Sequence, residues 1–169
     1  MINPKGVLCY MKKLIALFVA LMLLCGCAFA EENGFSGKIL VGNLPKDATV
    51  IRNEENADGY IEELEYDGLA TIALCCFSTS HARDAYLDGY SPDDEQILDD
   101  GSIVCGMQAD HRTFTSGENE DCNVVNAYSF EADEHVYLFL VSVDSDAYEE
   151  DGYPEMIQTW LDSLELADQ

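Results

Sequence analysis

The feature that most constrains this fold is the segment 136–143, in which almost every residue is apolar. Alternate residues of a β-strand point to opposite faces of its sheet. A short segment that is apolar at both sets of positions is typical of a strand in the middle of a sheet. We therefore predict a central strand over 135–143 that is covered on at least one side.

The neighbouring segments predict further strands and an antiparallel arrangement. Segment 123–130 joins 135–143 through the short loop 131–134, which indicates a hairpin. A strand over 102–108 is expected before that hairpin, and a strongly apolar strand over 69–77 follows the Asp67-Gly68 turn. The remaining candidate strands are 38–41, 48–52 and 60–66, of which the last is expected to be exposed or, alternatively, helical.

Three helices are expected between and after these strands. Ser80 is a candidate N-cap for a helix over 82–88, and Gly89 would end it. The order Ser91, Pro92 and then acidic residues is typical of a helix start, which predicts a second helix running to Leu98. The third helix begins at Pro154, and its apolar residues share one face: Met156, Ile157, Trp160, Leu161 and Leu164.

These elements predict an α+β fold in a single domain. Its antiparallel β-sheet would be flanked by helices, and the amphipathic C-terminal helix would pack on the sheet through Trp160. The domain would occupy residues 31–169, because the first 30 residues have a different character.

Residues 1–30 are typical of a secretory signal peptide. Lys12 and Lys13 precede an uninterrupted apolar segment, 14–24, which is too short to span a bilayer as a helix. The pattern Ala28-Phe29-Ala30 then predicts cleavage after Ala30. Met11 stands directly before the two lysines, so translation starting at Met11 is an alternative to a start at Met1.

A second processing route is open at the same place. The sequence Leu24-Cys25-Gly26-Cys27 resembles a bacterial lipobox, in which Cys27 would carry the lipid and become the first residue. Lipidation would attach the protein to the outer surface of the membrane. Both routes predict an extracytoplasmic protein, either secreted or lipid-anchored at the cell surface of a bacterial envelope.

The predicted domain is strongly acidic. Three of the eight basic residues lie in residues 1–30, so five basic residues remain against 33 acidic ones and the formal charge is −28. Such a surface repels nucleic-acid phosphates and anionic lipids, so we expect no nucleic-acid partner and no membrane contact except through a lipid anchor. We expect a monomer.

Four cysteines lie beyond residue 30: Cys75, Cys76, Cys105 and Cys122. An even number of cysteines in an exported domain indicates disulfides. Cys75 and Cys76 are adjacent on an expected strand and would face opposite ways, so we expect one of them to pair with Cys105 and the other with Cys122. Free, buried thiols are the alternative.

No catalytic or cofactor motif is evident. The histidines His81, His111 and His135 are scattered, and no Cys-x-x-Cys pattern supports a zinc or redox site. Ser80 and His81 with Asp84 suggest hydrolase chemistry, but no G-x-S-x-G surrounds a serine. The best calcium candidates are Asp144, Asp146, Glu149 and Asp151, although their spacing departs from the EF-hand pattern.

The order of elements resembles the PsbP-like domains of bacterial secreted proteins and lipoproteins. The resemblance covers about residues 36–166. It rests on Leu44-Pro45, on Tyr66-Asp67-Gly68, on the hairpin between Tyr128 and Val143, and on the closing Trp160-Leu161-Asp162-Ser163-Leu164. It implies an antiparallel sheet flanked by helices, in a family with varied binding and assembly roles and no catalytic residue to map here.

Taken together, the sequence favours a non-enzymatic accessory module that binds a protein or a small ligand, and it indicates no cofactor. The aromatic candidates for a binding patch are Tyr86, Tyr90, Tyr148 and Tyr153. A small secreted hydrolase and a structural protein stapled by disulfides are the alternatives.

Overall fold

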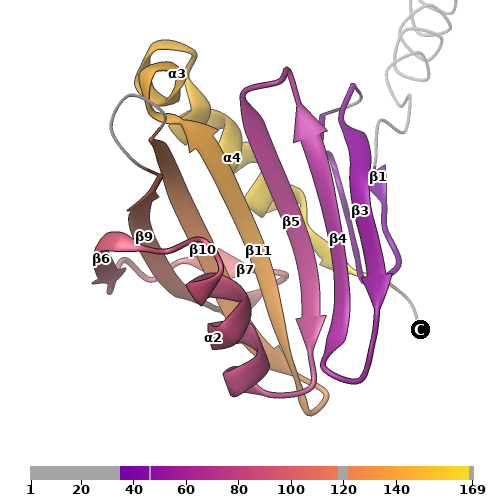
Figure 1. Ribbon diagram of the computed structural model, residues 1–169. Coiled ribbons are helices and arrows are strands. Elements are labelled where there is room, and N and C mark those ends of the chain that lie inside the picture. The colour runs from indigo at the N-terminus through magenta and orange to yellow at the C-terminus, as the bar shows by residue number, and fades with distance from the viewer. Residues whose placement is uncertain (1–34, 46, 118–121, 168–169) are drawn as a thin grey trace, which may run out of the picture. The chain divides into compact units, whose positions relative to one another are not determined.

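The computed structural model describes residues 35–45, 47–117 and 122–167. A seven-stranded antiparallel sheet dominates it, in the order β3-β4-β5-β11-β10-β9-β6 (Figure 1). Its strands are β3 (Thr49–Glu55), β4 (Gly59–Tyr66), β5 (Ala70–Phe77), β11 (His135–Asp144), β10 (Asn123–Ala132), β9 (Asp110–Ser116) and β6 (Asp93–Leu98). The expected α+β class is therefore wrong: the described chain is mostly β, and its helices are few and short.

Smaller elements complete the fold. A three-stranded sheet joins β1 (Phe35–Ser36), β2 (Leu40–Gly42) and β12 (Glu165–Leu166), and β7 (Ile103–Val104) pairs with β8 (Met107–Gln108). The helices are α2 (Ser80–Asp88), α3 (Ser145–Glu150) and α4 (Tyr153–Ser163). In Figure 1, α2 lies in front of the large sheet and α4 lies behind it.

The centre of the large sheet is formed by β5 and β11, the two most apolar segments of the sequence. Val136 through Val143 are all buried, and β5 is buried at most positions. Each strand is hydrogen-bonded on both sides, β11 to β10 and β5, and β5 to β4 and β11. The prediction of a central strand over this segment is confirmed.

Each face of the sheet has its own hydrophobic core. The larger core includes Leu74, Tyr137 and Phe139 of the sheet and packs against Trp160 and Leu161 of α4. The smaller core includes Cys75, Leu138 and Leu140, and only α2 among the described helices contributes to it, through Leu87. Because α2 is short, it leaves part of the sheet face with the smaller core uncovered, and hollows lie beside the helix.

Segment 93–98 forms a strand, so the helix predicted there is wrong. Pro92 and the acids after it are a helix-start signal, but only Ile97 and Leu98 are apolar, and adjacent residues cannot form an apolar helix stripe. Backbone pairing of β6 with β9, through Gln96 with Thr113 and Leu98 with His111, determines the local structure instead.

The strand predicted over 102–108 is also wrong, because a tight turn divides it. Cys105 and Gly106 both have positive φ angles, 52° and 75°, and reverse the chain between β7 and β8. The second strand that pairs with β10, beside β11, is β9, which carries no hydrophobic strand pattern because all its residues except Phe114 are polar. The next turn is shorter than predicted: only Asp133 and Glu134 separate β10 from β11, with φ angles of 50° and 64°.

Strand β4 is more buried than its sequence indicates. Tyr60, Ile61, Glu62 and Leu64 are all buried, so the exposed strand that we expected is incorrect. The burial arises because β4 contributes to both cores: Leu64 belongs to the larger core and Ile61 to the smaller one. Tyr66 also contacts Trp160 of α4 edge to face, with ring centroids 6.0 Å apart.

Two helix boundaries differ in detail from the prediction. Thr79, not Ser80, is the N-cap of α2, and its Oγ1 accepts a hydrogen bond from the Ala82 amide at 3.2 Å. The C-terminal helix begins as predicted next to Pro154, directly after Gly152, whose φ of 73° is the left-handed conformation that glycine tolerates.

Candidate functional site

Among the described residues, three hollows border α2. The hairpin hollow, of about 500 Å³, lies between the start of α2 and the β10–β11 turn. The arginine hollow, of about 290 Å³, shares Glu131 and Val136 with it, so the two adjoin. The tyrosine hollow, of about 360 Å³, lies between α2 and strands β3 and β4.

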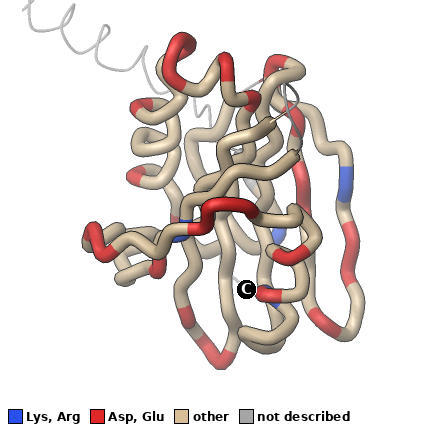
Figure 2. Tube along the Cα trace, turned by 60° about the vertical axis from the view of Figure 1, so that its left-hand side comes forward, with Lys and Arg blue, Asp and Glu red and all other residues tan. Residues whose placement is uncertain are grey.

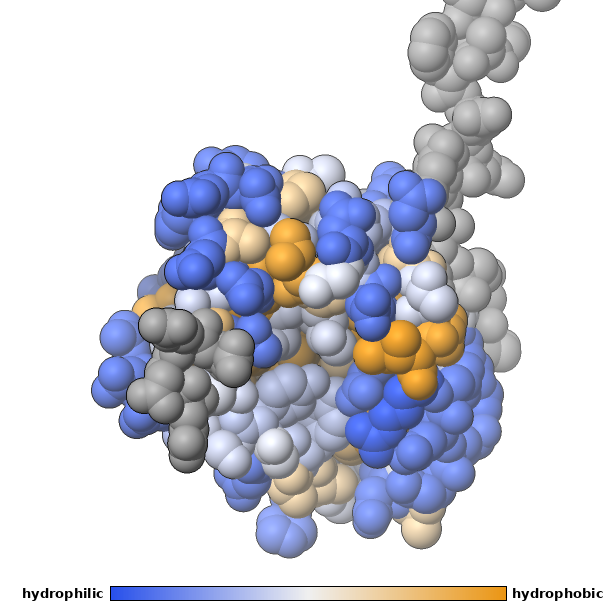
Figure 3. Space-filling model, turned by 45° about the horizontal axis from the view of Figure 1, so that its top comes forward, coloured by the Kyte–Doolittle hydropathy of each residue, from blue (hydrophilic) through white to orange (hydrophobic). Residues whose placement is uncertain are grey.

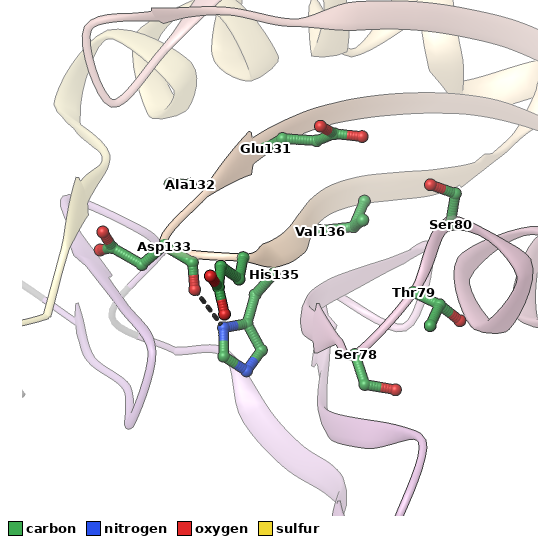
Figure 4. A pocket seen from close by; sticks show the side chains of 9 residues that line it. Ser78, Thr79, Ser80, Glu131, Ala132, Asp133, His135 and Val136 are labelled. Atoms are coloured by element: carbon green, nitrogen blue, oxygen red, sulfur yellow. Dashed lines mark hydrogen bonds between the residues drawn. The ribbon is translucent and has the colours of Figure 1, made fainter.

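The hairpin hollow is lined mainly by polar side chains and turn backbone (Figure 4). His135 donates a hydrogen bond from Nδ1 to the Asp133 carbonyl oxygen at 2.8 Å, so Nε2 is the basic nitrogen of the neutral ring. Ser78, on the opposite wall, donates from Oγ to the Asp58 carbonyl oxygen at 3.2 Å. Among the described residues, no serine hydroxyl lies within hydrogen-bond distance of a histidine nitrogen, so this hollow presents no nucleophile–base pair.

Arg83 of α2 lines the arginine hollow and is buried, with 9% of its surface exposed. Its Nη1 donates to Ser129 Oγ at 3.1 Å, and its Nε and Nη2 donate to Asp84 Oδ1 at 3.0 and 2.8 Å. Asp84 also lies 3.6 Å from Arg112 of β9. These contacts fasten α2 to the sheet, and they engage the Arg83 guanidinium within the protein.

The tyrosine hollow combines aromatic rings with a connected polar chain. Tyr86 and Tyr90 face each other edge to face, with ring centroids 5.7 Å apart and an interplanar angle of 69°. The Tyr86 hydroxyl donates to Glu63 Oε1 at 2.7 Å and lies 3.2 Å from the Tyr90 hydroxyl. Arg52 of β3 donates to the same Glu63 oxygen at 3.1 Å and to Glu54 at 2.7 Å.

The aromatic pair continues into the core below it. Phe77 lies 5.5 Å from Tyr86, and Phe114 lies 6.5 Å from Tyr90, between ring centroids. The hydroxyl of Ser116 donates to the Tyr90 carbonyl oxygen and ties the end of α2 to β9. The two tyrosine rings are therefore supported from beneath and from the side, as a rigid binding wall requires.

Burial keeps the two tyrosines of this hollow protonated. It raises the pKa of Tyr90 to about 12, and it raises the pKa of Tyr86 further, with nearby Cys75 and Tyr90 adding to the effect. Burial also raises the pKa of the Cys75 thiol. Both tyrosines are therefore neutral hydroxyl groups at physiological pH, and Cys75 is a thiol rather than a reactive thiolate.

Tyr86 and Tyr90 were predicted for a binding patch, whereas their polar partners were not. The structure brings these two together and separates Tyr148 and Tyr153 from them: Tyr153 is 1% exposed in the larger core, and Tyr148 accepts a hydrogen bond from Asn126. Glu63 and Arg52 meet only through the pairing of β3 with β4, including its irregularity between Val50 and Arg52, which no local sequence signal indicates.

His111 belongs to a separate buried network. Its Nδ1 lies 2.6 Å from Asp100 Oδ2, its Nε2 lies 3.1 Å from Asn126 Oδ1, and its ring stacks on Tyr128 with centroids 4.1 Å apart. Both ring nitrogens are thus engaged, which suits a structural role. His81 and Ser80 are exposed on α2, and the hydrolase alternative that they suggested stays a prediction.

All four described cysteines are free thiols. Cys75 lies in the smaller core, whereas Cys76 and Cys105 pack against the larger one. Cys122 precedes Asn123, which pairs with Asp144 at the end of β11 remote from Cys76 and its partner Tyr137. A bridge from Cys122 to Cys75 or Cys76 would span roughly 20 Å of strand, against about 6 Å between bridged Cα atoms. Disulfide pairing stays a prediction.

The calcium candidates lie on and around α3. Asp144 is the N-cap of this helix, and its Oδ1 accepts hydrogen bonds from the Asp146 amide at 2.9 Å and the Ala147 amide at 3.4 Å. Within residues 35–45, 47–117 and 122–167, no three His, Cys, Asp or Glu side chains gather in a way that could hold a metal ion. Asp146, Glu149 and Asp151 therefore do not form a metal site with Asp144 in this structure.

The predicted cleavage after Ala30 and lipidation of Cys27 lie outside the described residues. Over the part of the chain that is described, no helix has the length and hydropathy needed to cross a bilayer.

Comparison with known proteins leaves the family open. No family model matches the chain, and no curated protein matches it, so the resemblance to PsbP-like domains stays a prediction. A solved structure with some similarity is that of LpqN, described as involved in cell envelope biogenesis of Mycobacterium tuberculosis. It is 12% identical, covers 76% of this chain and 83% of its own, and superposes with a TM-score of 0.44.

Proposed function

We propose that this protein is an exported, non-enzymatic module that binds a small ligand in the tyrosine hollow. The observation that carries the proposal is the hydrogen-bonded chain from Tyr90 through Tyr86 to Glu63 and Arg52 along the wall of a hollow of about 360 Å³. Aromatic walls with a few convergent polar groups and perturbed pKa values are typical of ligand sites.

The rest of the described surface favours a small ligand over a broad apolar partner. Apart from the adjacent Val50 and Ile51 of β3, the large apolar side chains that are exposed belong to different parts of the chain, and the face in Figure 3 shows hydrophobic residues in separate patches among hydrophilic ones. These exposed side chains are Val50, Ile51, Leu69, Ile97 and Ile103. Extended protein interfaces usually need a larger continuous core.

The support for export is the predicted signal peptide in residues 1–30. Export is tested by measuring the intact mass of the protein recovered from the medium and from the membrane fraction of a Gram-positive host. A species that starts at Glu31 indicates secretion, and one that starts at a lipidated Cys27 indicates a surface lipoprotein. A protein that retains residues 1–30 in the cytoplasm would contradict export.

The binding site is tested by NMR on the exported protein. We expect a mixed library of neutral, anionic and cationic small molecules to contain ligands that shift the ring and amide signals of Tyr86 and Tyr90, and Tyr90→Leu to remove these shifts. Tyr148→Phe, on α3, is the matched control and should leave them unchanged. Ligands that shift only the signals of Ser78 and His135 would indicate binding in the hairpin hollow instead and would overturn the proposal.

A further inference from the structure

We infer that the ligand of the tyrosine hollow is a small organic cation carrying a quaternary or other alkylated ammonium group; this inference rests on the proposed function. The first reason is the direction of the hydrogen bonds. Glu63 accepts from both Tyr86 and Arg52, so the Tyr86 proton points to Glu63 and the neighbouring Tyr90 hydroxyl donates to Tyr86.

This directionality leaves the two tyrosine hydroxyls as acceptors, not donors, for a ligand, and Arg52 is the group of the hollow that keeps further N–H donors. The Tyr86 and Tyr90 protons are engaged within the wall, and the Arg52 groups that reach Glu63 and Glu54 are engaged by carboxylates. Glu63 Oε2, by contrast, has no hydrogen bond among the described contacts, and the Tyr90 oxygen keeps its lone pairs. A carbonyl or phosphate ligand would find no free hydroxyl proton on this wall.

The second reason is the geometry of the rings. The two tyrosine rings lie edge to face at 69°, so the edge of one ring covers part of the other's face, and a cation would contact the remaining ring face together with the neighbouring ring. Aromatic side chains arranged around a cation are the usual recognition element for alkylated ammonium groups. A simple metal ion is a poorer match, because it needs several oxygen ligands and a π face does not replace them.

The third reason is charge. Arg52 in the wall of the hollow is paired with two carboxylates, Glu63 in the same wall and the exposed Glu54, and the chain after position 30 has 33 acidic and five basic residues. Figure 2 shows acidic residues on loops and strand ends around the domain and few basic ones. This field raises the local concentration of cations and lowers that of anions, so an anionic ligand is disfavoured at the same site.

The decisive comparison uses choline and its uncharged carbon analogue, 3,3-dimethylbutan-1-ol, which has the same shape. We expect choline to bind the exported protein, by titration calorimetry and by shifts of the Tyr86 and Tyr90 ring signals, at least about tenfold more tightly than the analogue. Affinity should fall as sodium chloride is raised.

Two variants separate the contributions. Glu63→Gln should weaken choline about tenfold while leaving the analogue unchanged, and Tyr90→Leu should abolish binding of both. Glu65→Gln, an exposed neighbour on the same strand, is the charge-matched control and should change choline affinity less than twofold, since long-range charge effects are screened.

The outcomes distinguish this inference from the function on which it rests. Equal binding of the analogue, or binding by neutral or anionic library members alone at Tyr86 and Tyr90, would overturn the cation assignment and keep the binding module. If no compound shifts these tyrosines, both the assignment and the proposed function fail.

Discussion

Glu62 on β4 is a buried carboxylate that lacks a full set of partners. It is 6% exposed, and its Oε2 has no hydrogen-bond partner. Burial raises its pKa, and hydrogen bonds from Tyr60 and the Lys38 backbone offset this only in part. A raised folded-state pKa contributes stability below the unfolded value of about 4.3, and that contribution is lost as the pH rises through the folded value.

We therefore predict that Glu62→Gln increases the free energy of unfolding at neutral pH by about 1 kcal/mol, because a buried charged group without a partner costs more than a neutral one. The gain should disappear near pH 4, where the wild-type carboxyl is protonated. Urea unfolding at both pH values measures this. Glu65→Gln removes the same charge from an exposed position of β4, so an equal gain there would show that burial is not the cause.

The pKa of Asp100 is shifted in the opposite direction to that of Glu62. Burial alone would raise its pKa, but hydrogen bonds from Ser102 and His111 outweigh burial and lower the pKa to about 2. A depressed pKa contributes stability above the unfolded value of about 3.9, and this stability is lost as the pH falls towards 2.

Asp100→Asn should accordingly lower the melting temperature at neutral pH and should flatten its decline between pH 4 and 2. Thermal unfolding followed by circular dichroism across that range provides the test. Asp99→Asn, the exposed neighbour, should keep the wild-type profile. An unaltered profile in the Asp100 variant would mean that the contact with His111, 2.6 Å between Nδ1 and Oδ2, has no energetic role in solution.

At the scale of elements, the start of α2 matters most, because this helix borders all three hollows. Thr79 Oγ1 caps it by accepting from the Ala82 amide at 3.2 Å. We predict that Thr79→Ala costs about 1 kcal/mol of stability, as N-cap removal usually does. Ser80→Ala is the matched control, because Ser80 lies inside the helix and should change stability by less than half as much. Urea unfolding of both variants measures the two losses. A larger loss for Ser80→Ala would assign the cap to Ser80, and equal losses would show that Thr79 has no special role.

The Thr79→Ala variant also tests how α2 supports the tyrosine hollow. If α2 frays when its cap is removed, Tyr86 and Tyr90 lose their fixed arrangement, and ligand binding in the tyrosine hollow should weaken together with stability. Binding that is unchanged in a destabilised Thr79→Ala protein would indicate that the two rings are held by Phe77 and Phe114 rather than by the helix.

How far the sequence predicts the elements depends on the origin of each one. The strands over 69–77 and 135–143 carry their own hydrophobic pattern, and α4 carries an apolar stripe and a proline start, so all three were predictable. Strands β6 and β9 depend on pairing with each other and with β10, which local signals do not encode. Propensity therefore predicted a helix where tertiary pairing forms a strand.

The residues of the candidate site likewise differ in how far the sequence predicts them. Tyr86 and Tyr90 were visible as aromatic residues four positions apart at the end of a predicted helix. Arg52 and Glu63 lie on strands whose register is offset between Val50 and Arg52, and only the folded sheet brings them to the tyrosines. The sequence therefore indicates the aromatic wall of the hollow. Its polar groups can be placed only when the pairing register of β3 with β4 is known.

At the scale of the whole molecule, charge is the dominant property. Each basic side chain for which a contact is described already meets a carboxylate: Lys38 with Glu55, Arg52 with Glu54 and Glu63, Arg83 with Asp84, and Arg112 with Asp84 and Glu95. Most of the 33 acidic residues therefore repel one another without a local counter-charge. Exposed ion pairs contribute little, about 0–1 kcal/mol each, and do not offset this repulsion.

Screening of this repulsion should stabilise the folded protein. We predict that the melting temperature rises by about 4 °C or more between low salt and physiological sodium chloride, because the Debye length falls to about 8 Å and a gain of 1 kcal/mol corresponds to a few degrees. Calcium and magnesium chloride at equal ionic strength separate screening from specific binding. Equal shifts by the two divalent ions indicate screening alone. A larger shift by calcium that Asp146→Asn removes would instead indicate a calcium site formed around α3 when the ion is present, and it would show that the acidic surface has a selective role beyond solubility.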